Sequence, residues 1–344
     1  MAEGQSQTPP ARRVIVSGMR PTGRLHMGNL LGALRNWVAL QNQGSCYFFI
    51  ADWHTLTTSS EGESLAQRVQ DMVIDWIAAG LDPERVVIFR QSHVKEHAEL
   101  HLLLSMIVPT PWLLRNPTVK EQARDMGLIE GDDESEMTKI NYGYLGYPVL
   151  QAADILAYRA TAVPVGVDQA PHIEITREIA RRFNHMFRPV FPEPQTLLTE
   201  VPKIPGTDGR KMSKSYNNAV YLSDTPKEAD QKLTRMATDP ARVRRTDPGN
   251  PELCPAFNWH RVYCTAEELE FVSQGCRSAG IGCVECKKVM IKHVLAQLEP
   301  IQARRVELEQ QPQRVAEVLD TGNRQAQQVA AETLAEVREA MGLA

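Results

Sequence analysis

The sequence predicts an α/β protein whose first part is a doubly wound parallel sheet and whose last part is all helical. Short apolar runs at 14–16, 47–51 and 86–89 alternate with stretches of helical periodicity, the pattern of β-α-β units. After about residue 222 the alternation stops, and long stretches rich in Gln, Glu, Ala and Arg follow. A chain of 344 residues is long enough for one large and one smaller domain. We therefore expect a disordered lead-in over 1–12, an α/β domain over 13–222 and a helical domain over 223–344.

The helices of the α/β part are predicted from apolar periodicity. A helix over 66–80 has one apolar face and should end at Gly80; the face consists of Val69, Met72, Val73, Trp76 and Ile77. A second helix, from Pro148 to about Ala157, would place Gln151 and Asp154 on the same side. A third is expected over 172–183. Helices between parallel strands cover the faces of the sheet, so a ligand should bind beyond the carboxyl ends of the strands.

A glycine-rich segment, residues 21–29, follows the first predicted strand. Gly23 and Gly28 allow a sharp turn and a close approach of the backbone to a ligand. His26 and Asn29 lie three residues apart on the first helical turn, so their side chains face the same point. The adjoining helix N-terminus favours anions. Taken alone, the segment is better explained as a glycine-rich turn before a surface helix.

A basic loop lies much later in the chain and reads Lys211-Met212-Ser213-Lys214-Ser215, directly after Arg210. Ammonium groups on a flexible loop can follow negative charge as it develops on a leaving pyrophosphate. Taken alone, this loop is also typical of a solvated basic surface. The two segments together indicate a site that holds a nucleoside triphosphate from two sides.

These two segments resemble the HIGH and KMSKS signatures of the class I aminoacyl-tRNA synthetases. The stretches between them, at 147–156, 163–169 and 172–177, resemble the pattern of the tryptophanyl-tRNA synthetases, and the resemblance runs from about Val14 to the C-terminus. It implies a Rossmann-like catalytic domain over 13–222 and a helical anticodon-binding domain over 223–344. It also implies that Mg²⁺-bound ATP activates L-tryptophan, which is then transferred to tRNA(Trp), and that the enzyme is a homodimer.

The resemblance implies a role for individual residues of the nucleotide site. Catalytic roles fall on Thr22, His26, Asn29, Lys211 and Lys214. The residues expected to contact ATP are Arg20, Pro21, Thr22, Gly28, Asn29, Gly166, Val167, Asp168, Ile204, Lys211, Met212, Ser213, Lys214 and Ser215. Family members often carry Gln at the position of Arg20 and Glu at that of Val167. Arg20 therefore adds a cation where phosphates or a carboxylate would lie.

The amino-acid site is expected to select an indole through its single N–H donor. The resemblance assigns Asp154 as the buried acceptor of that hydrogen bond, which would select against rings without a donor. Tyr147 and Gln169 would hold the substrate ammonium group, and His54 would flank the ring. Gln151 stands where many tryptophan enzymes have Met, and a Gln near an Asp can also hold a phenol hydroxyl. A tyrosine-specific synthetase is therefore one alternative.

A second alternative is a synthetase-like RNA-binding or regulatory protein without catalysis. The intact residues Lys211, Lys214, Asp154 and Asp168 argue against it, since a decayed site should lose some of them. A third is an adenylating enzyme whose acceptor is not tRNA.

The cysteines are concentrated in one region. Five of the six lie between Cys254 and Cys286, and four follow the pattern Cys254-x21-Cys276-x6-Cys283-x2-Cys286. Four thiolates can bind a structural zinc ion or a four-iron–four-sulfur cluster. The spacing resembles the cluster-binding motif of a subset of tryptophanyl-tRNA synthetases. Cys264 is not part of that pattern and is expected to be a buried thiol.

Charge and hydropathy narrow the setting. The formal net charge is −4, so RNA binding would need a local basic patch. A candidate consists of Lys232, Arg235, Arg242, Arg244 and Arg245, although a solvated linker explains these charges equally well. No apolar run approaches the roughly 20 residues of a membrane helix. The first 13 residues contain no apolar signal core. We therefore expect a cytoplasmic protein with no membrane partner.

Overall fold

The computed structural model describes residues 13–57, 65–131, 134–137, 139–198 and 204–344. The expected lead-in over 1–12 lies outside these residues. Among the described residues, no helix combines the length and apolar character needed to span a bilayer.

The centre of the fold is a five-stranded parallel sheet. Its strands are β1 (Val14–Met19), β2 (Ser45–Ile50), β3 (Val86–Arg90), β4 (Ala162–Val165) and β5 (Gln195–Leu198). They are arranged in the order β3-β2-β1-β4-β5, and all neighbouring pairs are parallel. The chain builds outward from β1 to β3 and then returns to the other side of β1, which confirms the doubly wound fold. Ligands in such sheets bind where the strand order reverses, here between β1 and β4.

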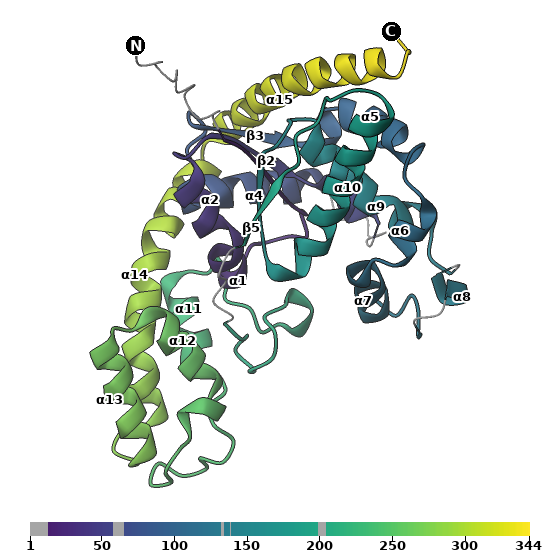
Figure 1. Cartoon of the computed structure of the whole chain (residues 1–344). Coiled ribbons are helices and arrows are strands. Elements are labelled where there is room, and N and C mark those ends of the chain that lie inside the picture. The colour runs from purple at the N-terminus through teal and green to yellow at the C-terminus, as the bar shows by residue number, and fades with distance from the viewer. Residues whose placement is uncertain (1–12, 58–64, 132–133, 138, 199–203) are drawn as a thin grey trace, which may run out of the picture.

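Helices cover both faces of the sheet and form two separate cores (Figure 1). Alternate strand residues supply the two cores: Ile15 belongs to the first and Val16 to the second. The first face is covered by α1 (Met27–Asn29), a π-helical turn (Leu30–Leu34), α2 (Arg35–Leu40) and α4 (Leu65–Ala79). The second is covered by α5 (Glu96–Ser105), α9 (Tyr142–Leu156) and α10 (Ala170–Met186).

The predicted helix boundaries are confirmed in one case and wrong in another. Helix α4 ends at Gly80, whose φ of 115° lies in the left-handed region. Helix α9 begins at Tyr142 instead of Pro148, because Asn141 caps it by accepting a hydrogen bond from the Tyr144 N–H at 2.7 Å. Pro148 removes one backbone hydrogen bond from the interior of α9. The helix continues through it because most of its residues are buried.

Four short helices follow the strands: α3 (Asp52–Leu56), α6 (Thr110–Leu114), α7 (Pro117–Asp125) and α8 (Glu134–Met137). A small apolar cluster on α7 packs against Tyr144 of α9. The segment between α5 and α9 is thereby fixed beside the reversal point of the sheet.

The C-terminal part consists of α11 (Pro226–Thr234), α12 (Pro255–Tyr263), α13 (Ala266–Arg277), α14 (Cys283–Glu309) and α15 (Pro312–Ala340). Helices α11 to α13 pack on α14, and α15 turns back to run along β3 (Figure 1). Asn323 of α15 accepts a hydrogen bond from the Arg90 N–H at 2.9 Å. A side chain at Gly322 would collide with the carbonyl oxygen of Ile88, so glycine permits this close approach. Although α15 follows the C-terminal helices in sequence, it packs against β3 of the central sheet.

Candidate active site

A cavity of roughly 500 Å³ lies at the reversal point of the sheet. Its walls come from the carboxyl end of β1, from β4 and from α9. Eight of the residues expected from the sequence line it: Arg20, Asn29, His54, Tyr147, Gln151, Asp154, Gly166 and Gln169. The expected nucleotide and amino-acid residues therefore meet in one cavity.

Asp154 is the most enclosed polar group of this cavity, with an exposed fraction of 0%. Its Oδ1 accepts from Gln91 Nε2 at 2.8 Å and lies 2.6 Å from His97 Nδ1. Its Oδ2 accepts from Gln91 Nε2 at 2.9 Å and lies 2.8 Å from His54 Nε2. His97 is in turn held by the hydroxyl of Tyr158 at 2.6 Å.

This network keeps Asp154 ionised. Burial alone would raise the pKa of its carboxyl, but the hydrogen bonds and charges of His54 and His97 outweigh burial and hold the pKa at about 2. A carboxylate offers about four acceptor positions, and four contacts already use them. An incoming donor must therefore share an oxygen with His54, the partner that also lines the cavity.

Tyr147 lines the cavity from the same helix as Asp154, two turns earlier in α9. Its hydroxyl lies 2.9 Å from His172 Nε2 and donates weakly to Gln122 at 3.4 Å. Burial raises the pKa of Tyr147 well above its usual value, so the phenol stays neutral. The Tyr147 ring stands edge-on to His54, with 6.3 Å between ring centroids. An aromatic substrate would therefore meet rings as well as Asp154.

The two signature segments lie side by side although they are far apart in sequence. The Met27 N–H donates to Val220 O, and the Leu222 N–H donates to Leu25 O, both at 2.9 Å. Lys214 Nζ reaches Thr22 Oγ1 at 3.4 Å. The ammonium group of the second segment thus stands directly over the turn of the first.

Asn218, which the sequence reasoning missed, organises the second segment. Its Oδ1 accepts from the Ser213 N–H at 2.8 Å, while its Nδ2 donates to Asp208 at 2.7 Å and to Lys211 O at 3.1 Å. Its exposed fraction is 1%. A buried amide that bridges both ends of a loop sets the loop's shape, and the only sequence signal for it was its closeness to Ser215.

Burial shifts the pKa of two groups at the junction of the segments. The pKa of Lys214 falls to about 8, mainly through burial and further through the charge of Arg68. The pKa of His26 falls to about 4, again mainly through burial and further through the charge of Lys214. His26 is therefore neutral at physiological pH, whereas Lys214 is mostly charged. Asn29 supports the turn by accepting a hydrogen bond from the His26 N–H at 3.0 Å.

Several expected nucleotide residues do not line the cavity. Ile204 and Met212 are buried in the first core, and Val167 is 73% exposed. Lys211 and Ser215 face solvent. Pro21, Thr22, Gly28, Ser213 and Lys214 lie outside the cavity lining, on the turn and loop described above. The side chain of Asp168 lies outside what the structure describes.

The four cysteines of the C-terminal pattern come from three elements. Cys254 caps α12, Cys276 lies near the end of α13, and Cys283 and Cys286 lie in the first turn of α14. Burial raises the pKa of the Cys286 thiol to about 12, and the other three thiols add to this shift. The four sulfur atoms are therefore electrostatic neighbours. Within the described part of the chain, no three of them have their sulfur atoms within 4.8 Å of one another.

Two of the five cations of the candidate basic patch are partly or fully buried and have partners within the protein. Lys232 is paired with Asp224 at 2.6 Å, and Arg242 is buried, donating to the carbonyl oxygens of Arg245 and Ile281. Arg235, Arg244 and Arg245 are exposed. Arg242 also lies beside the four-cysteine set, since its Nη1 is 3.9 Å from the sulfur of Cys276.

Comparisons with known proteins agree with this geometry. The sequence model of the family described as "tRNA synthetases class I (W and Y)" matches residues 10–299. The tryptophan–tRNA ligase of Thermotoga maritima is 52% identical over 332 residues, covering 96% of this chain and 99% of the relative. That of Aquifex aeolicus is 46% identical over 392 residues, covering 96% and 99%. The crystal structure of tryptophanyl-tRNA synthetase from Campylobacter jejuni, complexed with ADP and tryptophan, has a TM-score of 0.82 at 32% identity, covering 96% of this chain and 100% of that one. The chain therefore belongs to the tryptophan and tyrosine branch of the class I tRNA synthetases, and within it to the tryptophan–tRNA ligases.

Proposed function

We propose that the cavity at the reversal point binds tryptophan with its indole N–H at Asp154, and that ATP lies between the two signature segments. The observation that carries the amino-acid assignment is the ionised, fully buried Asp154. A charged acceptor selects a ring with a donor, because a ring that displaces His54 from Asp154 and brings no donor loses a charge-assisted hydrogen bond. When the indole enters, His54 gives up or shares its hydrogen bond to Asp154 Oδ2. Gln151 would lie beside the ring.

The reaction then needs positioning and charge stabilisation and no enzyme nucleophile. The tryptophan carboxylate attacks the α-phosphorus of Mg²⁺-bound ATP, and pyrophosphate leaves; the tRNA 3′ end later takes the aminoacyl group and AMP is released. Arg20 and Asn29 line the cavity on the phosphate side, and Lys214 stands over Thr22. Tyr147 and Gln169 are the groups on the cavity wall that would orient the substrate ammonium.

The assay that tests these assignments is exchange of pyrophosphate into ATP, measured with each amino acid in turn. We expect exchange with tryptophan, little with tyrosine, and a loss of at least 100-fold in Lys214→Ala, because one charge-assisted contact at a developing charge contributes about 3–4 kcal/mol. Exchange with tyrosine alone would refute the assignment of Asp154. Unchanged exchange in Lys214→Ala would refute the role of Lys214. Charging of tRNA by the same samples tests the acceptor.

We further propose that Cys254, Cys276, Cys283 and Cys286 hold a four-iron–four-sulfur cluster. Four thiols from three elements are the ligand set such a cluster takes. A single zinc ion binds sulfur at about 2.3 Å, which needs sulfur atoms closer together than those of the described chain. In a four-iron–four-sulfur cluster each thiolate would bind a different iron, so the four cysteine sulfur atoms can lie farther apart than around one zinc ion. Arg242 beside Cys276 offsets the negative charge of the thiolates.

Iron content and visible absorbance test this proposal. Anaerobically purified protein should be brown and contain about four irons per chain, the complement of such a cluster. Both should be lost in Cys283→Ser and kept in Cys46→Ser, which alters the buried cysteine of β2. Stoichiometric zinc without iron would show a structural zinc site instead.

The helical region carries the proposed tRNA site. Helices α11 to α14 would contact the anticodon arm, with the exposed Arg235, Arg244 and Arg245 pairing with its phosphates.

The exposed Met106 and Met186 lie where the ends of α5 and α10 adjoin, since Arg182 Nε donates to Ile107 O at 2.6 Å. This apolar surface supports a homodimer, which sedimentation velocity would detect. We propose that the enzyme works in the cytoplasm, where its tRNA substrate is.

A further inference from the structure

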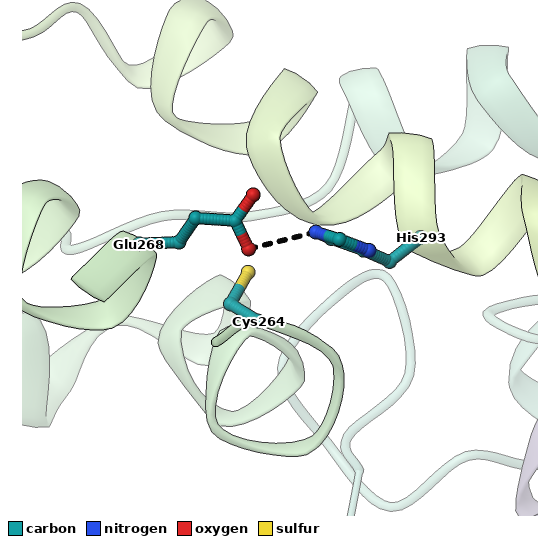
Figure 2. Close-up of side chains that lie close together, drawn as sticks. All are labelled: Cys264, Glu268 and His293. Atoms are coloured by element: carbon teal, nitrogen blue, oxygen red, sulfur yellow. Dashed lines mark hydrogen bonds and ion pairs between the residues drawn. The ribbon is translucent and has the colours of Figure 1, made fainter. Parts of the chain in front are cut away.

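A second group of metal-ligating side chains lies in the helical region, and none of them belongs to the four-cysteine set. Cys264 ends α12, Glu268 lies in the first turn of α13, and His293 lies on α14. One ligand atom of each residue lies within 4.8 Å of the other two. Figure 2 shows the three side chains pointing at one another. Across the described part of the chain, no other three Cys, His, Asp or Glu residues meet this condition.

We infer that Cys264, Glu268 and His293 bind a divalent cation of the zinc class. Thiolate, imidazole and carboxylate are the protein ligands that zinc takes, and a set of three leaves a fourth position for water. The ligands come from three consecutive helices, so a bound ion would join α12, α13 and α14.

The cation site is separate from the four-cysteine site. Cys254 and Cys264 cap opposite ends of α12, a helix of nine residues. At 1.5 Å per residue its length is about 13 Å. His293 lies two turns beyond Cys286 on α14. A single metal centre cannot use both sets of ligands.

Glu268 can bind a cation without leaving its structural position. Its Oε2 already closes the start of α13 by accepting from the Thr265 N–H at 3.0 Å, and it lies 2.7 Å from His293 Nε2. Its Oε1 contacts only the exposed ammonium of Lys292, at 3.5 Å. Oε2 thus holds the helix cap and is also the oxygen that faces His293 and Cys264 (Figure 2), while Oε1 faces the exposed Lys292.

Charge and hydrogen bonding at Cys264 also favour a cation. Among the described residues its sulfur has no hydrogen-bond partner, although it is partly buried beside the first core. Thiolate and carboxylate together carry two negative charges, and a divalent ion neutralises them with a neutral imidazole as third ligand. The structure thereby gives a ligand role to the cysteine outside the fourfold pattern.

Metal analysis of the full-length protein with its iron complement in place tests the inference. Dialysed wild-type protein, given zinc and then washed with a weak chelator, should keep one zinc per chain in addition to iron. Cobalt in place of zinc should give thiolate-to-metal charge-transfer absorption. Glu268→Gln retains a capping-box side chain and removes the charge, so it should fold and bind zinc at least tenfold more weakly. Cys264→Ser should abolish the charge-transfer band.

The matched control is Glu267→Gln, an exposed glutamate in the same helical turn, which should bind zinc as the wild type does. Zinc should raise the melting temperature of the wild type and the control but not of Glu268→Gln. Equal zinc affinity in Glu268→Gln and the control would overturn the inference. So would a zinc equivalent that disappears with iron in Cys283→Ser, because it would then belong to the four-cysteine site. If Cys283→Ser loses iron but keeps its zinc equivalent, the result supports a cation site that is separate from the cluster.

Discussion

The lowered pKa of Lys214 predicts that ATP affinity depends on pH in a range where few lysines titrate. In the free enzyme this pKa is about 8, mainly because the ammonium is partly buried against the first signature segment. Bound phosphates favour the charged form, so ATP binding above this pKa requires uptake of a proton. With a pKa near 8, the protonated fraction falls from about 0.9 at pH 7 to about 0.1 at pH 9. The apparent ATP dissociation constant should therefore rise about tenfold between these pH values.

Lys214→Arg is the control, because a guanidinium stays charged across this range. ATP binding is measured by calorimetry for both proteins at pH 7, 8 and 9, and the ratio of their dissociation constants cancels the titration of ATP itself. The ratio of wild type to variant should grow about tenfold over the two pH units. A ratio that stays constant would mean that Lys214 does not titrate near pH 8 or does not contact the phosphates.

Two further predictions concern stability, and a third concerns selectivity. Arg305→Met leaves the buried Asp75 without its ion-pair partner and should cost about 3–5 kcal/mol in urea unfolding at neutral pH. Burial raises the pKa of Asp75 to about 6 although Arg305 lowers it, so the variant should have a still higher pKa at Asp75, and protonation should reduce the deficit as the pH falls toward 6. Gly322→Ala should cost about 1–3 kcal/mol, since its methyl group must push α15 away from β3. Asp154→Asn should lower kcat/KM for tryptophan by about 10- to 100-fold, the value of a charge-assisted hydrogen bond, and an unchanged value would show that the indole binds elsewhere.

The sheet and the two signature segments were predictable because their signals are local. An apolar run such as 14–16 and a periodic helix such as 66–80 each contain their own evidence. The turn at 21–29 and the loop at 211–215 are recognisable from residue types within a few positions. Proline misled the prediction for α9, because tertiary burial outweighed the local cost of Pro148.

The support of Asp154 could not be predicted, because its partners come from distant parts of the chain. Gln91 and His97 lie 63 and 57 residues before Asp154, and neither stands in a recognisable motif. His54 was expected beside the substrate ring, yet it also holds the carboxylate, 100 residues away. Only the parallel sheet, which places the ends of β2 and β3 beside α9, brings these groups together. Pairwise contacts of this kind follow from topology and not from composition.

The same limit explains why the contacts that hold the second signature loop from two sides could not be predicted. On one side, Asn218 closes the loop upon itself. On the other, Trp259 of α12 donates to Pro205 O at 3.0 Å, and Gly209 packs so tightly on Pro255 that an added Cβ would lie 2.8 Å from it. Pro255 directly follows Cys254, so the helix capped by a cysteine of the C-terminal set is also the helix against which the loop rests. A movement of the loop that includes Gly209 would therefore shift this contact, which places the start of the nucleotide loop against the helical region.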